Sequence, residues 1–229
     1  MDTFEMKVIA RIRSDFKTKF GIPRQSGLVP ELVGKIVFEP EYRDPEALRG
    51  ITGYTHLWLV WEFSEMIREG KWSPTVRPPR LGGNTRVGVF ATRSPNRPNP
   101  IGLSSVRLLS VEKTENEGTV LLVSGADLMD GTPIYDIKPY LPLSDCHPDA
   151  IGGFSDGKKD YALAVEIPDE IVSGLPADKI EALRAILSED PRPSYQNDPE
   201  REYGFPFAGY EIRFRVSDGI LTVLSADKQ

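Results

Sequence analysis

The sequence lacks most of the residues on which common enzyme mechanisms depend. It has one cysteine, Cys146, and two histidines, His56 and His147. A lone cysteine cannot form a disulfide within the chain, and so few thiol and imidazole groups argue against a zinc site. The chain also has no G-x-x-x-x-G-K-[ST] loop, no G-x-G-x-x-G after a strand and no G-x-S-x-G elbow. We therefore expect no bound metal, no phosphate-binding loop or dinucleotide fold and no serine-hydrolase chemistry.

Long apolar runs are missing as well. No run approaches the ~20 residues that cross a bilayer, and the acidic start Met1–Glu5 lacks the regions of a signal peptide. A single cysteine is typical of proteins from a reducing compartment. We expect a cytoplasmic protein without a membrane partner.

The charge of the chain is unevenly distributed. The formal net charge is -6, yet residues 7–24 carry a net charge of +5 and residues 66–107 a net charge of +7. Clustered lysine and arginine indicate a basic face for phosphates, because the field at a groove is set by charges within about 10 Å. Two solvated, arginine-rich loops would give the same pattern, and charge alone does not separate these interpretations.

Short strand-like runs dominate the first two thirds of the sequence. Apolar and basic side chains alternate over residues 6–13, as in a half-buried strand. Leu57 to Trp61 is apolar throughout, which favours a strand covered on both faces. Asp130-Gly131 is a turn signal, and further apolar runs span residues 36–38, 87–92, 106–111 and 119–124. This pattern predicts a mainly β fold, with an antiparallel β-barrel domain over residues 1–150.

The last third predicts a small α+β domain over residues 151–229. Apolar residues at helical spacing favour a helix over residues 176–189, and Pro191 and Pro193 prevent its continuation. An alternating run over residues 210–216 then precedes Asp218-Gly219, which is typical of a hairpin turn, and residues 220–224 form the returning strand. The glycine- and aspartate-rich residues 145–160 contain the predicted domain boundary.

A stiff loop over residues 88–103 is the most unusual segment. Pro95, Pro98 and Pro100 fix the backbone, so the loop can hold polar groups with little loss of entropy on binding. Arg93 and Arg97 supply charge to it. A rigid structural turn is the alternative interpretation.

These segments together closely resemble the TsaA-like family, also called YaeB or TrmO proteins. The resemblance runs nearly from end to end of the chain. It rests on long, irregular motifs: Lys19-Phe20-Gly21-Ile22-Pro23-Arg24-Gln25, residues 75–84, the proline-rich loop, Asp130-Gly131-Thr132-Pro133, residues 136–142 and Asp190-Pro191-Arg192-Pro193-Ser194-Tyr195.

The resemblance implies a homodimeric, β-barrel tRNA methyltransferase that uses S-adenosylmethionine. Its expected reaction methylates N6 of N6-threonylcarbamoyladenosine, next to the anticodon of a tRNA. The positions implied to contact the methyl donor are Pro23, Arg24, Gln25, Ser64, Glu65, Arg93, Leu103, Leu128, Met129, Asp130 and Gly131.

The reaction needs orientation of the nitrogen and removal of one proton. The threonylcarbamoyl group makes N6–H more acidic, so a weak base suffices, and we take Asp136 and Tyr140 as the candidates. The target base lies in the anticodon loop, where a single-stranded base can be splayed out and read. The residues expected to contact the tRNA are Lys17, Lys19, Arg77, Arg80, Arg97, Arg192 and Tyr195.

Two other functions stay open at this point. A non-catalytic barrel could bind S-adenosylmethionine as a sensor, without any need for two basic segments. A methyltransferase acting on a small molecule or a protein would share the donor site but not the RNA.

Overall fold

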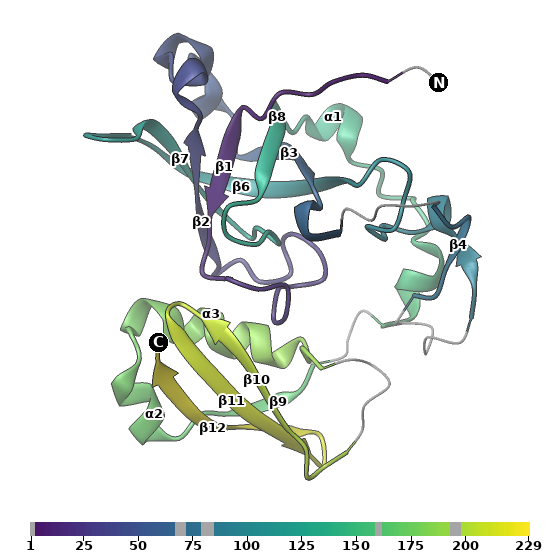
Figure 1. Ribbon diagram of the computed structural model, residues 1–229, viewed down its shortest axis with the longest axis vertical. Coiled ribbons are helices and arrows are strands. Elements are labelled where there is room, and N and C mark those ends of the chain that lie inside the picture. Colours follow the sequence, from purple (N-terminus) through teal and green to yellow (C-terminus); the bar gives the residue numbers. More distant parts are fainter. Residues whose placement is uncertain (1–2, 67–71, 79–84, 159–161, 193–197) are drawn as a thin grey trace. The chain divides into compact units, whose positions relative to one another are not determined.

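The computed structural model describes residues 3–66, 72–78, 85–158, 162–192 and 198–229. The chain folds into two compact units, and neither is a single stretch of sequence (Figure 1). The first unit contains Met1–Ser14, Arg24–Lys71 and Pro98–Cys146. The second contains Asp15–Pro23, Trp72–Arg97 and His147–Gln229. The predicted C-terminal domain, residues 151–229, therefore lies within a unit that also includes two segments from the N-terminal side of residue 150.

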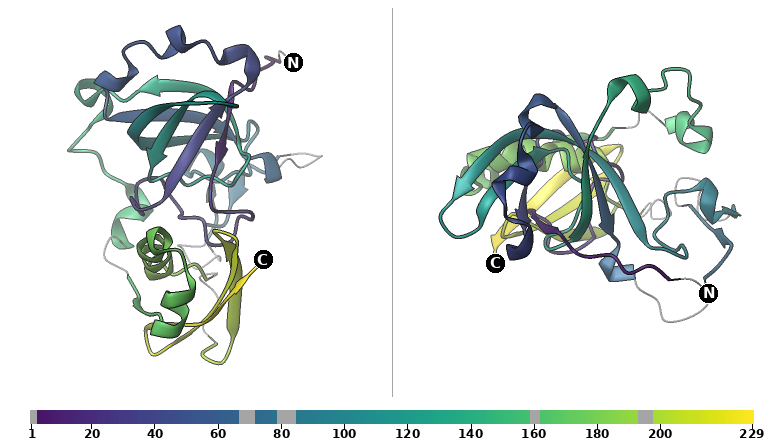
Figure 2. Two further views of the ribbon diagram at one scale, coloured as in Figure 1. Left: turned by 90° about the vertical axis from the view of Figure 1, so that its left-hand side faces the viewer. Right: turned by 90° about the horizontal axis from the view of Figure 1, so that it is seen from above.

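Six strands of the first unit form a sheet that closes on itself, as a barrel does (Figures 1 and 2). Their order around the ring is β1-β2-β7-β6-β3-β8, and every neighbouring pair is antiparallel. The prediction of a mainly β, antiparallel architecture is confirmed. The strands are β1 (Ala10–Arg13), β2 (Val33–Phe38), β3 (His56–Glu62), β6 (Ile101–Thr114), β7 (Gly118–Ser124) and β8 (Pro133–Pro139).

The interior of the ring is filled by alternate side chains, since successive residues of a strand point to opposite faces. In β3, Leu57, Leu59 and Trp61 are buried, and the residues between them are half-buried. The outer face of β3 is thus covered only in part, which corrects the prediction of a strand covered on both faces. Ile12, Ile36, Leu121 and Ile134 meet the β3 side chains in the same core cluster.

Strand direction alternates around the ring, so three strands end and three strands begin at each end of it. At one end β1, β7 and β3 finish while β2, β6 and β8 begin. We call this the Gly131 end, because the turn at Gly131 leads into β8 there. The other end, where β8 finishes beside the first residue of β3, is called the Tyr140 end.

The second unit is built on a four-stranded sheet with the order β10-β11-β12-β9. Helices α2 and α3 lie on one face of this sheet (Figure 2, left). The predicted helix and terminal hairpin are confirmed, and the hairpin turn has Asp218 and Gly219 at φ 51° and 78°. The elements are β9 (Ala164–Glu166), α2 (Asp169–Gly174), α3 (Ala177–Ser188), β10 (Glu202–Phe207), β11 (Tyr210–Ser217) and β12 (Ile220–Lys228).

The segment Asp15–Pro23 packs within this second unit. Phe16 lies against Phe207, with ring centroids 5.6 Å apart, and Asp15 accepts a 2.7 Å hydrogen bond from Lys179 of α3. Gly21 has φ +88°, and a β-carbon there would lie 2.4 Å from Cδ2 of Phe205. A glycine is therefore required at this position by both the backbone and the neighbouring ring.

A short hairpin of β4 (Thr75–Val76) and β5 (Val87–Gly88) completes the second unit. A strand was predicted over residues 87–92, but the structure ends β5 at Gly88 and continues as the one-turn helix η6 (Val89–Ala91). The reason is local: Thr92 donates both its backbone N–H and its hydroxyl to the Val89 carbonyl, which closes the turn.

The remaining helices are short. They are α1 (Pro142–Asp145), η1 (Pro40–Tyr42), η2 (Pro45–Leu48), η3 (Ile51–Gly53), η4 (Ser64–Met66) and η7 (Gly153–Lys158). Within the described ranges, no helix has the length and apolar character needed to cross a membrane.

Candidate functional site

A turn over residues 128–132 closes the Gly131 end between β7 and β8. Its backbone is held to the end of β1, because Gly131 donates to the Ile12 carbonyl at 2.8 Å and Ile12 donates to the Thr132 carbonyl at 3.2 Å. Gly131 adopts φ +79°, a conformation that favours glycine. The predicted Asp130-Gly131 turn is confirmed, and it is a fixed feature rather than a loose loop.

Ser14 holds the side chain of Asp130 in this turn. Its backbone N–H donates to Oδ1 of Asp130 at 3.1 Å, and its hydroxyl donates to the Leu128 carbonyl at 2.9 Å. Arg11 adds a 3.1 Å bond to the Gly131 carbonyl. Asp130 is half-buried. The hydrogen bond from the Ser14 N–H orients its carboxylate, so the charge is preorganised for a ligand.

A buried hydrogen-bond chain supports the same end from inside the ring. Nε1 of Trp61 donates to Oγ of Ser104 at 2.9 Å, and Ser104 donates to Oδ1 of Asp127 at 2.5 Å. Gly102 lies beside the indole, where a β-carbon would come within 2.3 Å of Trp61. The start of β6 is therefore shaped around one tryptophan.

Most of the positions expected to contact a methyl donor gather at the Gly131 end. The connection before β2 is tied there, because Ser105 donates to Oγ of Ser26 and Gly27 donates to the Gly125 carbonyl. Phe63, which follows β3, donates to the Pro100 carbonyl just before β6. The positions that the ring brings to this end are Arg24, Gln25, Ser64, Glu65, Leu103, Leu128, Met129, Asp130 and Gly131.

Their exposure differs in a way that suits a ligand with polar and apolar parts. Arg24, Ser64 and Glu65 are exposed, and Leu103 is 52% exposed although it is apolar. Leu128 is buried and belongs to the core. The two remaining donor positions, Pro23 and Arg93, are part of the second unit, where Pro23 is buried and Arg93 is exposed.

Asp136 lies on the outer face of the ring, in line with Leu103. Val60 of β3 pairs with Leu103 on one side and with Asp136 on the other. Neighbouring strands are about 4.8 Å apart, so Leu103 and Asp136 are separated by roughly 10 Å across β3. Asp136 forms a 2.6 Å ion pair with Lys138 and accepts a hydrogen bond from the Ile137 N–H.

Tyr140 is placed at the opposite end of the ring. Its backbone N–H donates to the His56 carbonyl at the start of β3, and its ring packs 5.5 Å from that of Trp58. Burial raises the pKa of Tyr140, and the neighbouring Cys146 and Asp145 raise it further. Within one chain, the fold does not bring Tyr140 to the Gly131 end, and its phenol stays protonated at neutral pH.

Tyr135 and Glu62 form a close pair near the Gly131 end. The Tyr135 hydroxyl donates to Oε2 of Glu62 at 2.5 Å. Burial, followed by the hydrogen bond and charge of Glu62, raises the pKa of Tyr135 to about 12. The tyrosine is thus a hydrogen-bond donor that holds the carboxylate at the end of β3.

The basic residues expected to contact tRNA have different environments. Lys17, Lys19 and Arg77 are exposed. The guanidinium of Arg97 donates to the carbonyls of Ser94, Val89 and Thr92, which stiffens the proline-rich loop.

Arg192 is also held by its own surroundings. It is 9% exposed and makes two hydrogen bonds to Asp190, at 2.8 and 2.9 Å. Arg80 and Tyr195 lie outside the described residues. Lys17, Lys19 and Arg77 are accessible to a phosphate, and the tRNA contacts predicted for all seven residues stay predictions.

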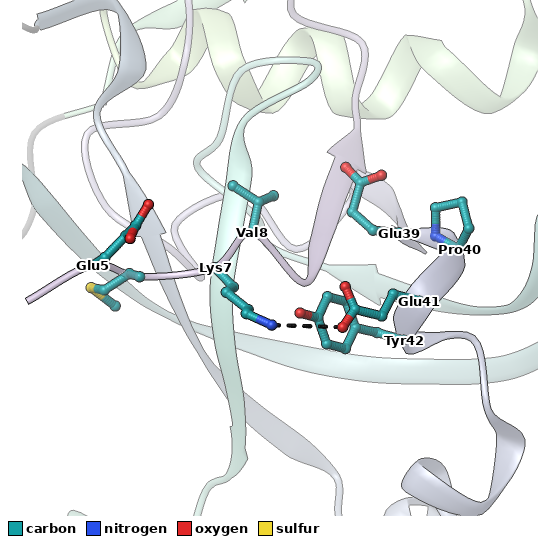
Figure 3. A pocket seen from close by; sticks show the side chains of 8 residues that line it. Glu5, Lys7, Val8, Glu39, Pro40, Glu41 and Tyr42 are labelled. Atoms are coloured by element: carbon teal, nitrogen blue, oxygen red, sulfur yellow. Dashed lines mark ion pairs between the residues drawn. The ribbon is translucent and has the colours of Figure 1, made fainter.

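A separate hollow of about 680 Å³ lies at the Tyr140 end, between the N-terminal segment and η1 (Figure 3). Lys7 crosses it and pairs with Glu41 at 3.6 Å, and this carboxylate raises the pKa of the lysine. Glu5 and Glu39 also line the hollow. Since acidic groups outnumber the single lysine there, the hollow does not suit a phosphate.

Comparison with known proteins decides the family. The chain matches the tRNA-methyltransferase O N-terminal domain over residues 11–146 and the TrmO C-terminal domain over residues 161–229. The chain belongs to the tRNA-methyltransferase O family.

Individual relatives agree with this assignment. A tRNA (adenine(37)-N6)-methyltransferase of Escherichia coli is 39% identical over 235 residues, covering 99% of this chain and 99% of that protein. A putative S-adenosylmethionine-dependent methyltransferase of Pseudomonas aeruginosa is 42% identical over 210 residues, covering 88% of each. A crystal structure of TrmO from Pseudomonas aeruginosa superimposes with a TM-score of 0.80 at 33% identity, covering 100% of this chain and 99% of that one.

The residues that support the Gly131 end were not predicted from the sequence. Ser14, Ser26 and Asp127 show no motif, because their role is to accept or donate single hydrogen bonds across the ring end. One signal was available in β6. Its inward positions Gly102 and Ser104 are small, which indicates a large neighbour such as Trp61.

Proposed function

We propose that this chain is an S-adenosylmethionine-dependent tRNA methyltransferase that methylates the adenosine next to the anticodon, at N6 of N6-threonylcarbamoyladenosine. The observation that carries the proposal is the gathering of the donor positions at the Gly131 end of a member of this family. A homodimer acting in the cytoplasm is part of the proposal.

The residues of the Gly131 end fit the parts of such a donor. The carboxylates of Asp130 and Glu65 suit its cationic groups, and the guanidinium of Arg24 suits its carboxylate. The exposed face of Leu103 suits an adenine ring, because flat aromatic surfaces bury well against apolar side chains. When bound, S-adenosylmethionine supplies a methyl group on a sulfonium, which is an excellent leaving group.

The task left to the protein is orientation and proton removal. Asp130 is held by Ser14 and Glu62 by Tyr135, so charged groups at this end are preorganised. Orientation of this kind can lower a barrier by about 7–11 kcal/mol. Transfer forms the N6–CH₃ bond and breaks a carbon–sulfur bond, and the N6 proton passes to a base.

Asp136 is the better placed of the two proposed bases. It lies across β3 from Leu103, whereas Tyr140 is at the other end of its own ring. A phenol with a raised pKa keeps its own proton at neutral pH and is therefore a poor acceptor for the N6 proton. We assign proton acceptance to Asp136, and within one chain Tyr140 has no part in proton removal, because it lies at the opposite end of the ring.

Methyl transfer to defined tRNA tests the proposal. Labelled S-adenosylmethionine is incubated with the protein and with tRNA that carries or lacks the threonylcarbamoyl group, and nucleosides are then separated. Label is expected in one anticodon-loop nucleoside, and only with the threonylcarbamoylated tRNA. Label in the unmodified tRNA would contradict the proposed substrate, and label in neither would contradict the function.

The two other functions give different results. A sensor would bind the donor in calorimetry, with no methyl transfer to RNA and no effect of added tRNA. A methyltransferase for proteins or small molecules would label those fractions of a cell extract while total RNA stays unlabelled.

A further inference from the structure

An exposed aromatic pair lies at the base of the β4–β5 hairpin, in the second unit. Trp72 is 50% exposed and Phe90 is 76% exposed, and their ring centroids are 6.0 Å apart with an interplanar angle of 38°. Val89 donates to the Pro74 carbonyl at 2.9 Å, which ties the two segments together beside the rings. Large apolar surfaces left to solvent commonly mark a binding surface.

The segment that carries this pair, residues 72–97, has charged side chains of one sign. Residues 72–97 contain five arginines and no lysine, aspartate or glutamate, although the whole chain has a net charge of -6. Arg77 follows β4 and Arg86 precedes β5, so the paired strands place them opposite each other on the hairpin. Both residues are exposed. A partner of this surface should therefore offer flat apolar groups together with negative charge.

We propose that Trp72 and Phe90 form a stacking platform for an unpaired base of the tRNA, while Arg77 and Arg86 contact phosphates of the same strand. Unstacked bases of single-stranded RNA commonly lie on aromatic side chains, and basic residues beside them follow the backbone. This inference rests on the proposed tRNA substrate and adds a contact outside the donor positions.

A second copy of the chain fits this surface less well. A two-fold contact would bring the same patch of each copy together, and with it the arginines of both hairpins. Like charges at a desolvated contact repel each other. A base-paired duplex fits less well too, since its bases are already stacked on one another.

Paired substitutions of Phe90 separate stacking from plain apolar contact. Phe90→Tyr keeps the aromatic face, whereas Phe90→Leu keeps an apolar side chain but loses the aromatic face. Binding of an anticodon stem–loop RNA is measured by fluorescence anisotropy. Stacking predicts that Phe90→Leu weakens binding about 5- to 150-fold and that Phe90→Tyr stays close to the wild type. Ile151→Ala, at a residue of the same unit that is 89% exposed, is the control for surface truncation and should bind normally.

Salt dependence separates the roles of the rings and the arginines. For single-stranded RNA, each phosphate contact contributes about 0.7 to the slope of log K against log salt. Arg77→Gln should make this salt dependence less steep by about that amount, and Phe90→Leu should leave it unchanged. Donor binding without RNA, measured by calorimetry, should be unaffected by either Phe90 variant.

Three results would overturn the platform. The first is normal RNA binding by Phe90→Leu, and the second is an equal loss of RNA affinity in Phe90→Leu and Phe90→Tyr. The third is conversion of a dimer to a monomer by Phe90→Leu in sedimentation, which would assign the aromatic pair to contact with a second copy. If the wild type methylates tRNA and Phe90→Leu binds RNA normally, only the platform fails. If the wild type never methylates tRNA but Phe90→Leu weakens RNA binding as expected, only the proposed function fails.

Discussion

Trp61 lies so close to Gly102 that a β-carbon on the glycine would be 2.3 Å from Cε2 of the indole. The contact is made inside the ring, where the tryptophan is 6% exposed. Gly102→Ala must therefore shift either the indole or the start of β6. We expect it to lower the free energy of unfolding by about 1–3 kcal/mol.

The same variant should weaken donor binding, because Leu103 follows Gly102 directly and belongs to the proposed donor site. Urea unfolding and calorimetry with S-adenosylmethionine measure the two effects. Gly53→Ala is the matched control, since no atom lies within 4 Å of its added β-carbon. Normal donor binding by Gly102→Ala would show that the start of β6 does not shape the site.

The charge of Asp130 can be tested apart from its role as a hydrogen-bond acceptor. Asp130→Asn keeps an oxygen that can accept from the Ser14 N–H, whereas Asp130→Ala removes it. We expect both variants to weaken donor binding, because each removes the negative charge. Only Asp130→Ala should also lose about 1 kcal/mol of stability. Donor affinity unchanged in Asp130→Asn would contradict an electrostatic role for this residue.

Much of the ring could be predicted from the sequence, because residues 6–13 alternate apolar and basic side chains and the other strands are short apolar runs. The turn at Gly131 was equally clear, since Asp-Gly supplies the backbone conformation that the turn needs. The predicted donor positions came from the family resemblance, and strand direction explains why nine of them share one end.

Other features depend on contacts that a linear pattern does not reveal. The run of residues 87–92 is apolar enough for a strand, yet Thr92 folds it into a turn through two bonds to Val89. Arg97 was expected to bind phosphate, but its donors point to backbone carbonyls of its own loop. Tyr140 is close to Asp136 in sequence and distant in the ring, because β8 runs from one end to the other.

Gly21 holds the segment that carries Lys17 and Lys19 against the C-terminal sheet. Gly21→Ala places a β-carbon 2.4 Å from Phe205 and forces alanine to a φ of +88°. We expect the free energy of unfolding of the second unit to fall by about 2 kcal/mol. This loss should be seen as faster hydrogen exchange in β10 and α3. Binding of tRNA should weaken as well.

Gly174→Ala is the control for this change, because nothing lies within 4 Å of its added β-carbon. Exchange in β10 as slow as in the wild type would show that the segment does not depend on Gly21.

Tyr135 makes stability depend on pH in the alkaline range. Its pKa rises from 10.0 to about 12 on folding, so the folded state binds the proton more tightly than the unfolded state does. The stabilisation is complete below pH 10 and is lost as the pH rises through about 12. Tyr135→Phe should flatten the fall in unfolding free energy over this range.

Glu62→Gln tests the cause of this shift. Removing the carboxylate should lower the pKa of Tyr135, although burial continues to raise it. Ultraviolet absorbance of the phenolate, compared between Glu62→Gln and the wild type, measures the change. An unchanged titration would mean that Glu62 does not contribute.

The nucleosides of cellular tRNA test the central claim most directly. Bulk tRNA from cells with and without this protein is digested and analysed by mass spectrometry. We predict that N6-methyl-N6-threonylcarbamoyladenosine disappears without the protein, that its unmethylated precursor accumulates, and that the wild-type chain restores methylation while Asp130→Asn restores less. An anticodon-loop nucleoside profile that is the same with and without the protein would contradict the account.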